Sequence, residues 1–261
     1  MNAAYSTFLD GALDVARAAA AAAAEVIGYY YHRGVAVEIK ADQTPVTIAD
    51  REAEVAIKRI LRHAFPEHAF YGEELGREGE SDFLWLIDPI DGTKAFVRGY
   101  PMFSSQIALM HCGALVLGVS CAPQYGETTW ARAGGGAFLD GSPIRVAATA
   151  EFGPSTAISI GNVKTLTGDA RWNVLGDLIR RSGRIRGYGD FLHYHLLARG
   201  CIDLVIESDV NILDVAALAV IVREAGGTFT DLAGVELTLD TTSVLAGTPT
   251  LHALALTLGL G

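Results

Sequence analysis

One ten-residue segment constrains this chain more than any other: residues 85–94, which read WLIDPIDGTK. An apolar run typical of a buried strand leads directly into two carboxylates three positions apart, Asp88 and Asp91. We expect Pro89 to stop the strand between them, so that both carboxylates turn into one small volume. Two anions so close repel each other unless a cation lies between them, and an all-oxygen ligand set suits a hard ion such as Mg²⁺. The segment therefore predicts a metal site at the end of a buried strand.

Gly92 and Thr93 follow the second carboxylate at once. A glycine lets the backbone come close to a ligand, and the threonine brings a hydroxyl to the point where a helix can begin. Because the first N–H groups of a helix have no partner within it, they form a ready seat for a phosphate. A metal beside a phosphate seat indicates metal-assisted phosphoryl chemistry. The alternative is an Asp-rich turn, in which Asp88 and Asp91 only accept hydrogen bonds from nearby backbone N–H groups.

Further motifs support the first interpretation. A GEE motif occupies residues 72–74, a TIAD motif residues 47–50, and Asp214 opens an apolar helix. With them the chain resembles the inositol monophosphatase superfamily, whose pattern is GEE, then W-x-I-D-P-I/L-D-G-T, then a distal W-D-x-A-A/G before a glycine pair. The resemblance runs from about residue 40 to residue 227, with all motifs in family order. Leu213 stands where the family usually has Trp, a departure expected to alter packing more than ligation.

The resemblance implies a set of metal ligands. They are Glu73, Asp88, the backbone carbonyl of Ile90, Asp91 and Asp214, which would hold two or three Mg²⁺ ions, with Mn²⁺ as a possible substitute. Asp88 is central and can bridge two ions. Two ions about 3.5–4 Å apart would clamp the attacking and the leaving oxygen of an in-line displacement. Taken alone, Glu73 would be a solvated loop acid, and Asp214 an acid favoured by the dipole of its helix.

The resemblance also indicates catalytic roles. Thr93 is the candidate that orients the nucleophilic water, and Glu73 or Asp50 would accept the proton. Asp50 also completes a Thr47-x-x-Asp50 capping-box pattern, so a catalytic role and a helix-capping role both stay open. The N–H groups of Gly92 and Thr93 would bind the substrate phosphate. All seven histidines are interpreted as structural or surface residues.

Substrate choice is predicted to depend on Asp190 and Glu207. Glu207 ends an apolar strand, and the resemblance places it beside the leaving group. Asp190 follows Gly189, where inositol enzymes typically have a Gly-Thr pair that meets sugar hydroxyls. This departure, with GTKAFVRG after the aspartates, resembles the histidinol-phosphate phosphatase branch, in which a carboxylate can pair with an aminated substrate. The alternative is that Asp190 caps the helix that starts at Phe191.

The remaining pattern predicts a layered α/β architecture. Helical spacing covers residues 6–30 and 47–63, and period-two patterns between residues 104 and 146 indicate consecutive antiparallel strands. We expect a single catalytic domain over residues 1–261, with a strand-rich part to about residue 150 and alternating strands and helices from about residue 151. The resemblance implies a five-layered αβαβα sandwich of the inositol monophosphatase and fructose bisphosphatase type.

Composition narrows the partners. The chain has 261 residues, half of them apolar, which is enough for a substantial core. A net charge of −10 argues against nucleic acid or an anionic membrane as a partner. Three cysteines without paired spacing are interpreted as small buried residues in a reducing cytoplasm. Since no segment resembles a secretory signal or a membrane span, we expect a cytoplasmic protein.

The sequence thus predicts a Mg²⁺-dependent phosphomonoester hydrolase of a small phosphorylated metabolite. The branch resemblance indicates histidinol phosphate, in histidine biosynthesis, and the family resemblance indicates a homodimer. The close alternative is an inositol monophosphatase or a broad sugar-phosphate phosphatase. A nucleotide or fructose bisphosphate phosphatase is disfavoured because the sequence offers no added basic cluster for a second phosphate. A non-catalytic phosphate- or metal-binding scaffold is disfavoured because the motif keeps all its carboxylates.

Overall fold

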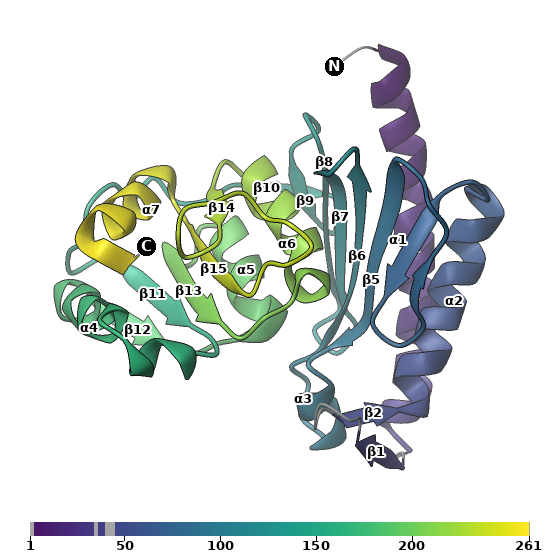
Figure 1. Cartoon of the computed structure of the whole chain (residues 1–261), viewed down its shortest axis with the longest axis horizontal. Helices are drawn as coiled ribbons and strands as arrows, with labels where there is room; N and C mark the ends of the chain where they lie inside the picture. Colours follow the sequence, from purple (N-terminus) through teal and green to yellow (C-terminus); the bar gives the residue numbers. More distant parts are fainter. Residues whose placement is uncertain (1–2, 34–35, 40–44, 261) are drawn as a thin grey trace.

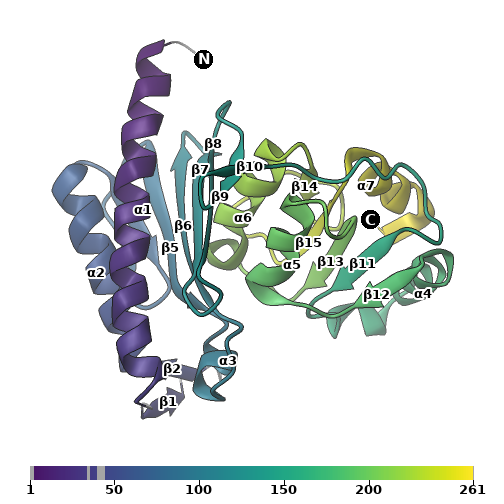
Figure 2. The same cartoon turned by 180° about the vertical axis from the view of Figure 1, so that it is seen from behind.

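The computed structural model describes residues 3–33, 36–39 and 45–260. These residues form five stacked layers in which helix pairs and sheets alternate (Figure 1), and the view from behind shows the same order (Figure 2). The αβαβα sandwich expected from the sequence is confirmed. The helix layers are, in order, α1 (Ala3–Tyr31) with α2 (Ile48–Ala64), α5 (Asp190–Ala198) with α6 (Ile212–Glu224), and α4 (Arg171–Arg181) with α7 (Pro249–Ala255).

The larger sheet is antiparallel except for the parallel pair β3–β5. It includes the antiparallel strands predicted between residues 104 and 146, which are confirmed. In spatial order its strands are β10 (Ser142–Ile144), β9 (Ala137–Leu139), β8 (Glu127–Arg132), β7 (Ala114–Ala122), β6 (Ser104–His111), β5 (Phe83–Asp91), β3 (Ala69–Gly72) and β4 (Gly76–Glu78).

The smaller sheet is mixed, because β15 runs antiparallel to both of its neighbours while the other pairs are parallel. In spatial order its strands are β12 (Arg184–Arg186), β11 (Ala157–Ile160), β13 (Leu204–Ser208), β15 (Ser243–Gly247) and β14 (Thr228–Thr230). The short elements are the hairpin β1 (Val37–Ile39) and β2 (Pro45–Thr47), the helix α3 (Thr93–Val97), a 3₁₀ turn (Thr165–Gly168) and a last helical turn (Leu256–Leu260).

The helix α6 lies at the centre of the molecule and is apolar around its whole circumference. All of residues 215–222 are buried, in one cluster with side chains from both sheets. A helix that is apolar on every side belongs in a core rather than at a surface. This packing fixes the first turn of α6, which carries Asp214, at the junction of the two sheets.

Two local expectations are wrong. Pro89 does not stop its strand, since β5 continues to Asp91 through an irregularity in its pairing with β6. Of the cysteines, only Cys121 is buried, while Cys112 and Cys201 are exposed. Cys112 lies in the turn between β6 and β7 with a φ of 50°, and Cys201 follows the end of α5. In the described ranges no helix is long and apolar enough to span a membrane. The single-domain assignment stays a prediction.

Candidate active site

The two carboxylates of the central motif share a pocket because β5 contains a bulge. Asp88 pairs with Gln106 and Asp91 with Ser104, so two residues of β5, Pro89 and Ile90, lie opposite one residue of β6. Side chains three positions apart in a regular strand point to opposite faces, and one extra residue restores them to the same side. Proline is tolerated at a bulge because it has no N–H to donate. Both carboxylates line a cavity of about 360 Å³.

Asp214 joins this pair from the first turn of α6. Carboxylate oxygens of Asp88, Asp91 and Asp214 all lie within 4.8 Å of one another. Asp214 is the third residue of α6, and its carboxylate accepts hydrogen bonds from the backbone N–H (2.8 Å) and the side-chain amide (2.8 Å) of the helix cap Asn211. The cap therefore fixes the carboxylate at the helix start, although 123 positions separate it from Asp91 in the sequence.

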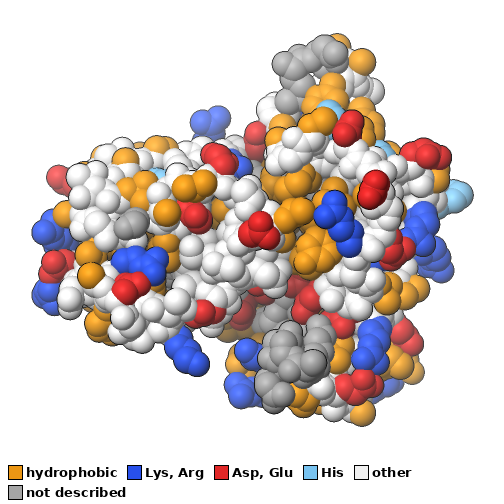
Figure 3. Space-filling view, in the orientation of Figure 1, with side chains coloured by type: hydrophobic (Ala, Val, Ile, Leu, Met, Phe, Trp, Pro, Cys, Tyr) orange, Lys and Arg blue, Asp and Glu red, His pale blue; other side chains and the backbone are white. Residues whose placement is uncertain are grey.

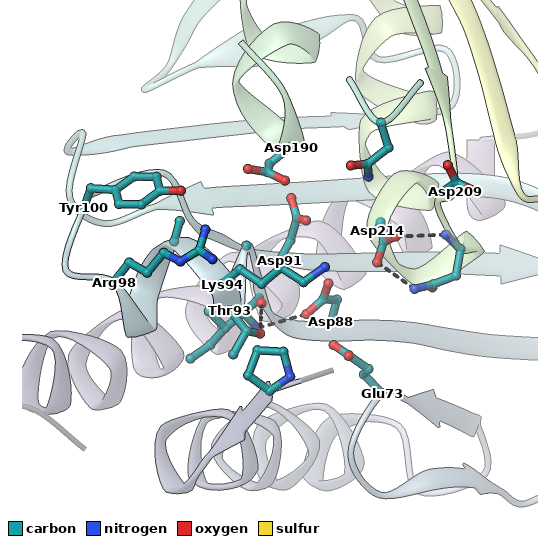
Figure 4. Close-up of a pocket in the computed structure, with 16 residues that line it drawn as sticks. Glu73, Asp88, Asp91, Thr93, Lys94, Arg98, Tyr100, Asp190, Asp209 and Asp214 are labelled. Carbon is teal, nitrogen blue, oxygen red and sulfur yellow. Dashed lines mark hydrogen bonds between the residues drawn. The ribbon is translucent and has the colours of Figure 1, made fainter. Parts of the chain in front are cut away.

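Glu73 and Ile90 complete the predicted ligand set at the same pocket (Figure 4). Glu73 follows β3 directly, and its backbone N–H donates to the carbonyl of Ile87 in β5 at 3.1 Å. Its carboxylate lies next to Asp88 in Figure 4 and contributes to the raised pKa of that residue. The structure thus brings all five predicted ligands together, and their binding of metal stays a prediction.

The like charges of the carboxylates in this cluster repel one another. Burial, followed by the charge of Glu73, raises the pKa of Asp88 well above its ordinary value. Burial and the charge of Asp190 do the same for Asp91, and burial raises the pKa of Asp214 to about 7. Within the described part of the chain, Asp91 Oδ2 is buried without a hydrogen-bond partner. A hard divalent cation binds to buried carboxylate oxygens of this kind and compensates the repulsion between their charges. The residues present therefore fit Mg²⁺.

Thr93 links the cluster to Asp50. Its hydroxyl lies 3.1 Å from Asp50 Oδ1 and 2.9 Å from the carbonyl oxygen of Ile90. The other carboxylate oxygen of Asp50 accepts from the backbone N–H (2.8 Å) and the hydroxyl (2.6 Å) of Thr47, which caps α2. The capping box predicted for Asp50 is confirmed, and the same carboxylate also contacts Thr93. The catalytic role of Asp50 stays a prediction.

Asp190 enters the pocket from α5. Its φ is 44°, a left-handed conformation that side chains other than glycine rarely adopt, and such strain is typical of functional sites. The helix-capping alternative is wrong, because the cap is Gly189 and no described backbone N–H donates to the Asp190 side chain. In Figure 4 the carboxylate points toward Asp91. Burial raises its pKa, and no donor in the described ranges makes a hydrogen bond to it.

Glu207 differs from Asp190 because the protein itself satisfies it. Its carboxylate accepts from His193 Nε2 at 3.0 Å, from the hydroxyl of Tyr194 at 2.6 Å and from the backbone N–H of Asn162 at 3.3 Å. Burial by itself would raise the pKa of Glu207, but the charge of His193 and these hydrogen bonds hold it below its ordinary value. Glu207 lies behind the main pocket, in a smaller cavity that Asp190 and Asp214 also line.

Several residues of the site were missed by the sequence analysis. His193 agrees with its interpretation as a structural residue, since it is buried and bonded to Glu207, but its link to a predicted substrate residue was not foreseen. On the basic side, Lys94 of α3 and Arg98, which caps the end of α3, line the pocket together with Tyr100. Their spacing of four residues places both on one face of a helix, a signal that the sequence contains.

In the space-filling view acidic side chains gather where the two halves of the molecule meet (Figure 3), and α3 adds positive charge at this acidic junction.

Comparisons with known proteins agree with this geometry. The Inositol monophosphatase family matches residues 9–258. The chain is 41% identical to Histidinol-phosphatase of Mycobacterium tuberculosis over 210 residues, which cover 76% of this chain and 78% of that protein. It is 38% identical to Fructose-1,6-bisphosphatase/inositol-1-monophosphatase of Thermotoga maritima over 192 residues, 73% of each. The solved structure of inositol monophosphatase from Anabaena superposes with a TM-score of 0.83 at 30% identity, covering 96% of this chain and 95% of that one. This chain belongs to the inositol monophosphatase family and is a phosphatase that acts on small phosphorylated substrates.

Proposed function

We propose that this phosphatase hydrolyses histidinol phosphate to histidinol and inorganic phosphate, a step of histidine biosynthesis, with Mg²⁺ in its carboxylate pocket. The observation that carries the proposal is the Asp190 carboxylate. It lies in the same cavity as the predicted metal ligands and accepts no hydrogen bond from any described group. The identity of 38–41% to three histidinol-phosphatases supports the same substrate.

The carboxylate cluster would hold the metal. Asp88 lies between the other acids and can contact two ions, with Asp91 and Asp214 on one side and Glu73 with the Ile90 carbonyl on the other. When bound, two Mg²⁺ ions, with a third or with Mn²⁺ as variants, would neutralise the phosphate, activate the attacking water and stabilise the leaving oxygen.

Thr93 and Asp50 would orient the attacking water and receive its proton. The Thr93 hydroxyl can donate its one proton to Asp50 at 3.1 Å or to the Ile90 carbonyl at 2.9 Å, and in both cases its oxygen keeps a lone pair that can accept a hydrogen bond from the water. As the water oxygen bonds to phosphorus, its proton would pass toward Asp50, either directly or through the hydroxyl. The ester P–O bond would break at the same time, and the leaving alkoxide would take a proton from solvent to become the alcohol product. Burial raises the pKa of Asp50, which makes it a better proton acceptor. Glu73 is the second candidate for this role.

The backbone of Gly92 and Thr93 would hold the phosphate. Gly92 has a φ of 93°, and a Cβ atom there would lie 2.5 Å from the carbonyl oxygen of Met102. Only glycine therefore fits this turn, and the first N–H groups of α3, which have no partner within the helix, would bind the phosphate. Lys94 and Arg98 line the same cavity and would add positive charge on the phosphate side.

Asp190 would select the leaving group. Histidinol carries an α-ammonium group, whereas inositol offers only hydroxyls. The Asp190 carboxylate accepts no hydrogen bond from a described group and interacts with His193 and Lys94 only through their charges. It can therefore pair with that ammonium, and a charge-assisted bond of this kind is stronger than one to a hydroxyl. Glu207 would contribute less directly, because His193 and Tyr194 already occupy one of its oxygens.

By the same resemblance to the family, we expect the protein to act as a homodimer in the cytoplasm.

An inositol monophosphatase, or a broad sugar-phosphate phosphatase, is the second candidate, favoured by the TM-score of 0.83 to a solved inositol monophosphatase. A phosphate-release assay with purified protein and Mg²⁺ separates the two. We expect the highest kcat/KM with histidinol phosphate, and lower values with inositol 1-phosphate and fructose 1,6-bisphosphate. Faster hydrolysis of inositol 1-phosphate than of histidinol phosphate would overturn the assignment of the substrate and leave the phosphatase assignment intact.

A further inference from the structure

Glu54 is a buried acid that the mechanism above does not use. It lies in α2, and its side chain has no exposed surface. Both of its carboxylate oxygens face the turn that follows β3. Oε2 accepts from the backbone N–H of Glu74 at 2.7 Å, and Oε1 accepts from the N–H of Leu75 at 3.2 Å. These are the two residues that directly follow Glu73.

Lys58 compensates the buried charge. Its Nζ lies 2.7 Å from Glu54 Oε1, and its side chain is only 4% exposed. The same ammonium group contacts Glu78 Oε1 at 2.9 Å and the carbonyl oxygen of Gly76 at 3.5 Å, both in β4. The pair therefore ties α2 to both ends of the turn between β3 and β4. An ion pair within a helix needs no such connections and is usually exposed to solvent.

Gly72 makes this approach possible. A Cβ atom on Gly72 would lie 1.8 Å from Glu54 Oε1, inside the carboxylate itself. On the other side, the N–H of Glu73 is held by the carbonyl oxygen of Ile87 in β5 at 3.1 Å. The backbone around Glu73 is thus held at two places. The N–H of Glu73 itself is bonded to β5, and the N–H groups of the next two residues are bonded to Glu54.

We propose that Glu54 is a positioning residue that holds the Glu73 carboxylate in place for the divalent cation. The proposal rests on the proposed function in one respect, namely that Glu73 ligates the metal. A buried ion pair is seldom worth more to stability than a well-packed apolar pair. Stability alone therefore does not explain the buried pair of Glu54 and Lys58. Holding the loop that carries a metal ligand does explain it, as expected for residues that orient metal ligands without contacting the metal.

The test measures Mg²⁺ binding rather than turnover. Metal-free wild type and Glu54→Gln are titrated with Mg²⁺ by isothermal titration calorimetry. We expect Glu54→Gln to weaken Mg²⁺ affinity by about 10- to 100-fold, the usual effect of losing a partner behind a ligand. Glu52→Gln is the matched control, because Glu52 lies in the same helix, is exposed and bonds only the hydroxyl of Tyr30 among the described side chains. Its Mg²⁺ affinity should equal that of wild type.

A double-mutant cycle with Glu73→Gln shows whether the effect passes through Glu73. In the Glu73→Gln background, adding Glu54→Gln should change Mg²⁺ affinity by less than the single substitution does in wild type. Equal effects in both backgrounds overturn the proposal, as does a lower melting temperature of Glu54→Gln with unchanged Mg²⁺ affinity. If Glu73→Gln itself binds Mg²⁺ like wild type, the ligand assignment of the proposed function fails instead.

Glu54→Asp covers the case in which Glu54→Gln does not fold. It keeps the buried charge beside Lys58, but its side chain is one methylene shorter and reaches less far toward the N–H groups of Glu74 and Leu75. We expect the same direction of change, a weaker Mg²⁺ affinity in a folded protein. Wild-type affinity in Glu54→Asp would contradict the positioning role.

Discussion

The two sides of the pocket are built on different principles. On the β5 side, Asp88, Asp91 and Asp214 crowd together, and burial and the charges of neighbouring carboxylates raise all their pKa values. On the α5 side, Glu207 has three donors and a lowered pKa. The first group of carboxylates needs a cation to compensate its charge, whereas groups of the protein already stabilise the charge of Glu207.

This difference suggests a division of labour. The β5 side, which we call the metal side, would perform the reaction with any substrate. Asp190 on the opposite side accepts no bond from a described donor and would meet only the leaving group. Substitutions on the metal side should therefore slow every substrate alike, and substitution of Asp190 should change the order of substrates.

The largest effect is expected for Asp91→Asn. The substitution removes one charge from the most crowded cluster, where Asp91 Oδ2 is buried without a described partner. We expect kcat to fall by at least about 10²-fold with histidinol phosphate and inositol 1-phosphate alike, as for the loss of an electrostatic stabiliser. Steady-state kinetics at saturating Mg²⁺ measures this.

Asp209→Asn is the matched control, because Asp209 lines the same pocket but is exposed. It should keep most of the wild-type rate, and wild type in excess chelator should lose its activity. A near-normal rate in Asp91→Asn, or full turnover with chelator, contradicts the two-metal assignment.

The metal side could largely be predicted from the sequence because its parts are local. Asp88, Asp91, Gly92 and Thr93 fall within six residues, so proximity in the chain guarantees proximity in space. What could not be predicted is how the two carboxylates come to lie on the same side of the strand. A proline between two acids indicates the end of a strand, whereas the structure keeps the strand and adds a bulge. Asp214 lies far along the chain, and only the family resemblance placed it there.

The α5 side was harder to predict because its contacts join distant elements. His193 and His195 are two apart and therefore point in different directions from one helix, but the sequence does not reveal that α5 lies between two sheets. His193 meets Glu207 of the smaller sheet, and His195 meets Ser120 of the larger sheet at 2.8 Å. The left-handed conformation of Asp190 was equally hidden, because an acid after a glycine is typical of a helix cap.

The second prediction concerns Asp190→Asn. Leaving a charge without its partner in a partly desolvated pocket costs on the order of 2–5 kcal/mol, which corresponds to roughly 30-fold or more in kcat/KM. We expect this loss for histidinol phosphate and little change for inositol 1-phosphate, measured by phosphate release with both substrates. The α5 side would then be established as the selective one. Equal losses with both substrates would mean that Asp190 belongs with the metal side instead.

The smallest effect is a pH dependence of stability that should differ in sign between the two sides. For Asp214, the folded pKa of about 7 lies above the ordinary 3.8, so the folded protein binds its proton more tightly than the unfolded chain. The metal-free protein should therefore gain stability as pH falls from 8 through 7, by up to about 1.4 kcal/mol per pH unit for this carboxylate. Glu207 has a lowered pKa, so its contribution is lost only as pH falls below its ordinary 4.5.

Urea unfolding of metal-free protein at pH 8 and pH 6.5 tests this prediction. Buried histidines with lowered pKa values, such as His195, oppose the gain only below about their ordinary 6.5, so the window stays above that value. Asp214→Asn provides the reference, because it keeps the histidines and removes the carboxylate. Wild type should gain more stability than Asp214→Asn between pH 8 and 6.5, and saturating Mg²⁺ should remove the difference in slope, since a bound cation takes the place of the proton. If wild type and Asp214→Asn instead change in parallel without Mg²⁺, Asp214 does not have the raised pKa that distinguishes it from Glu207.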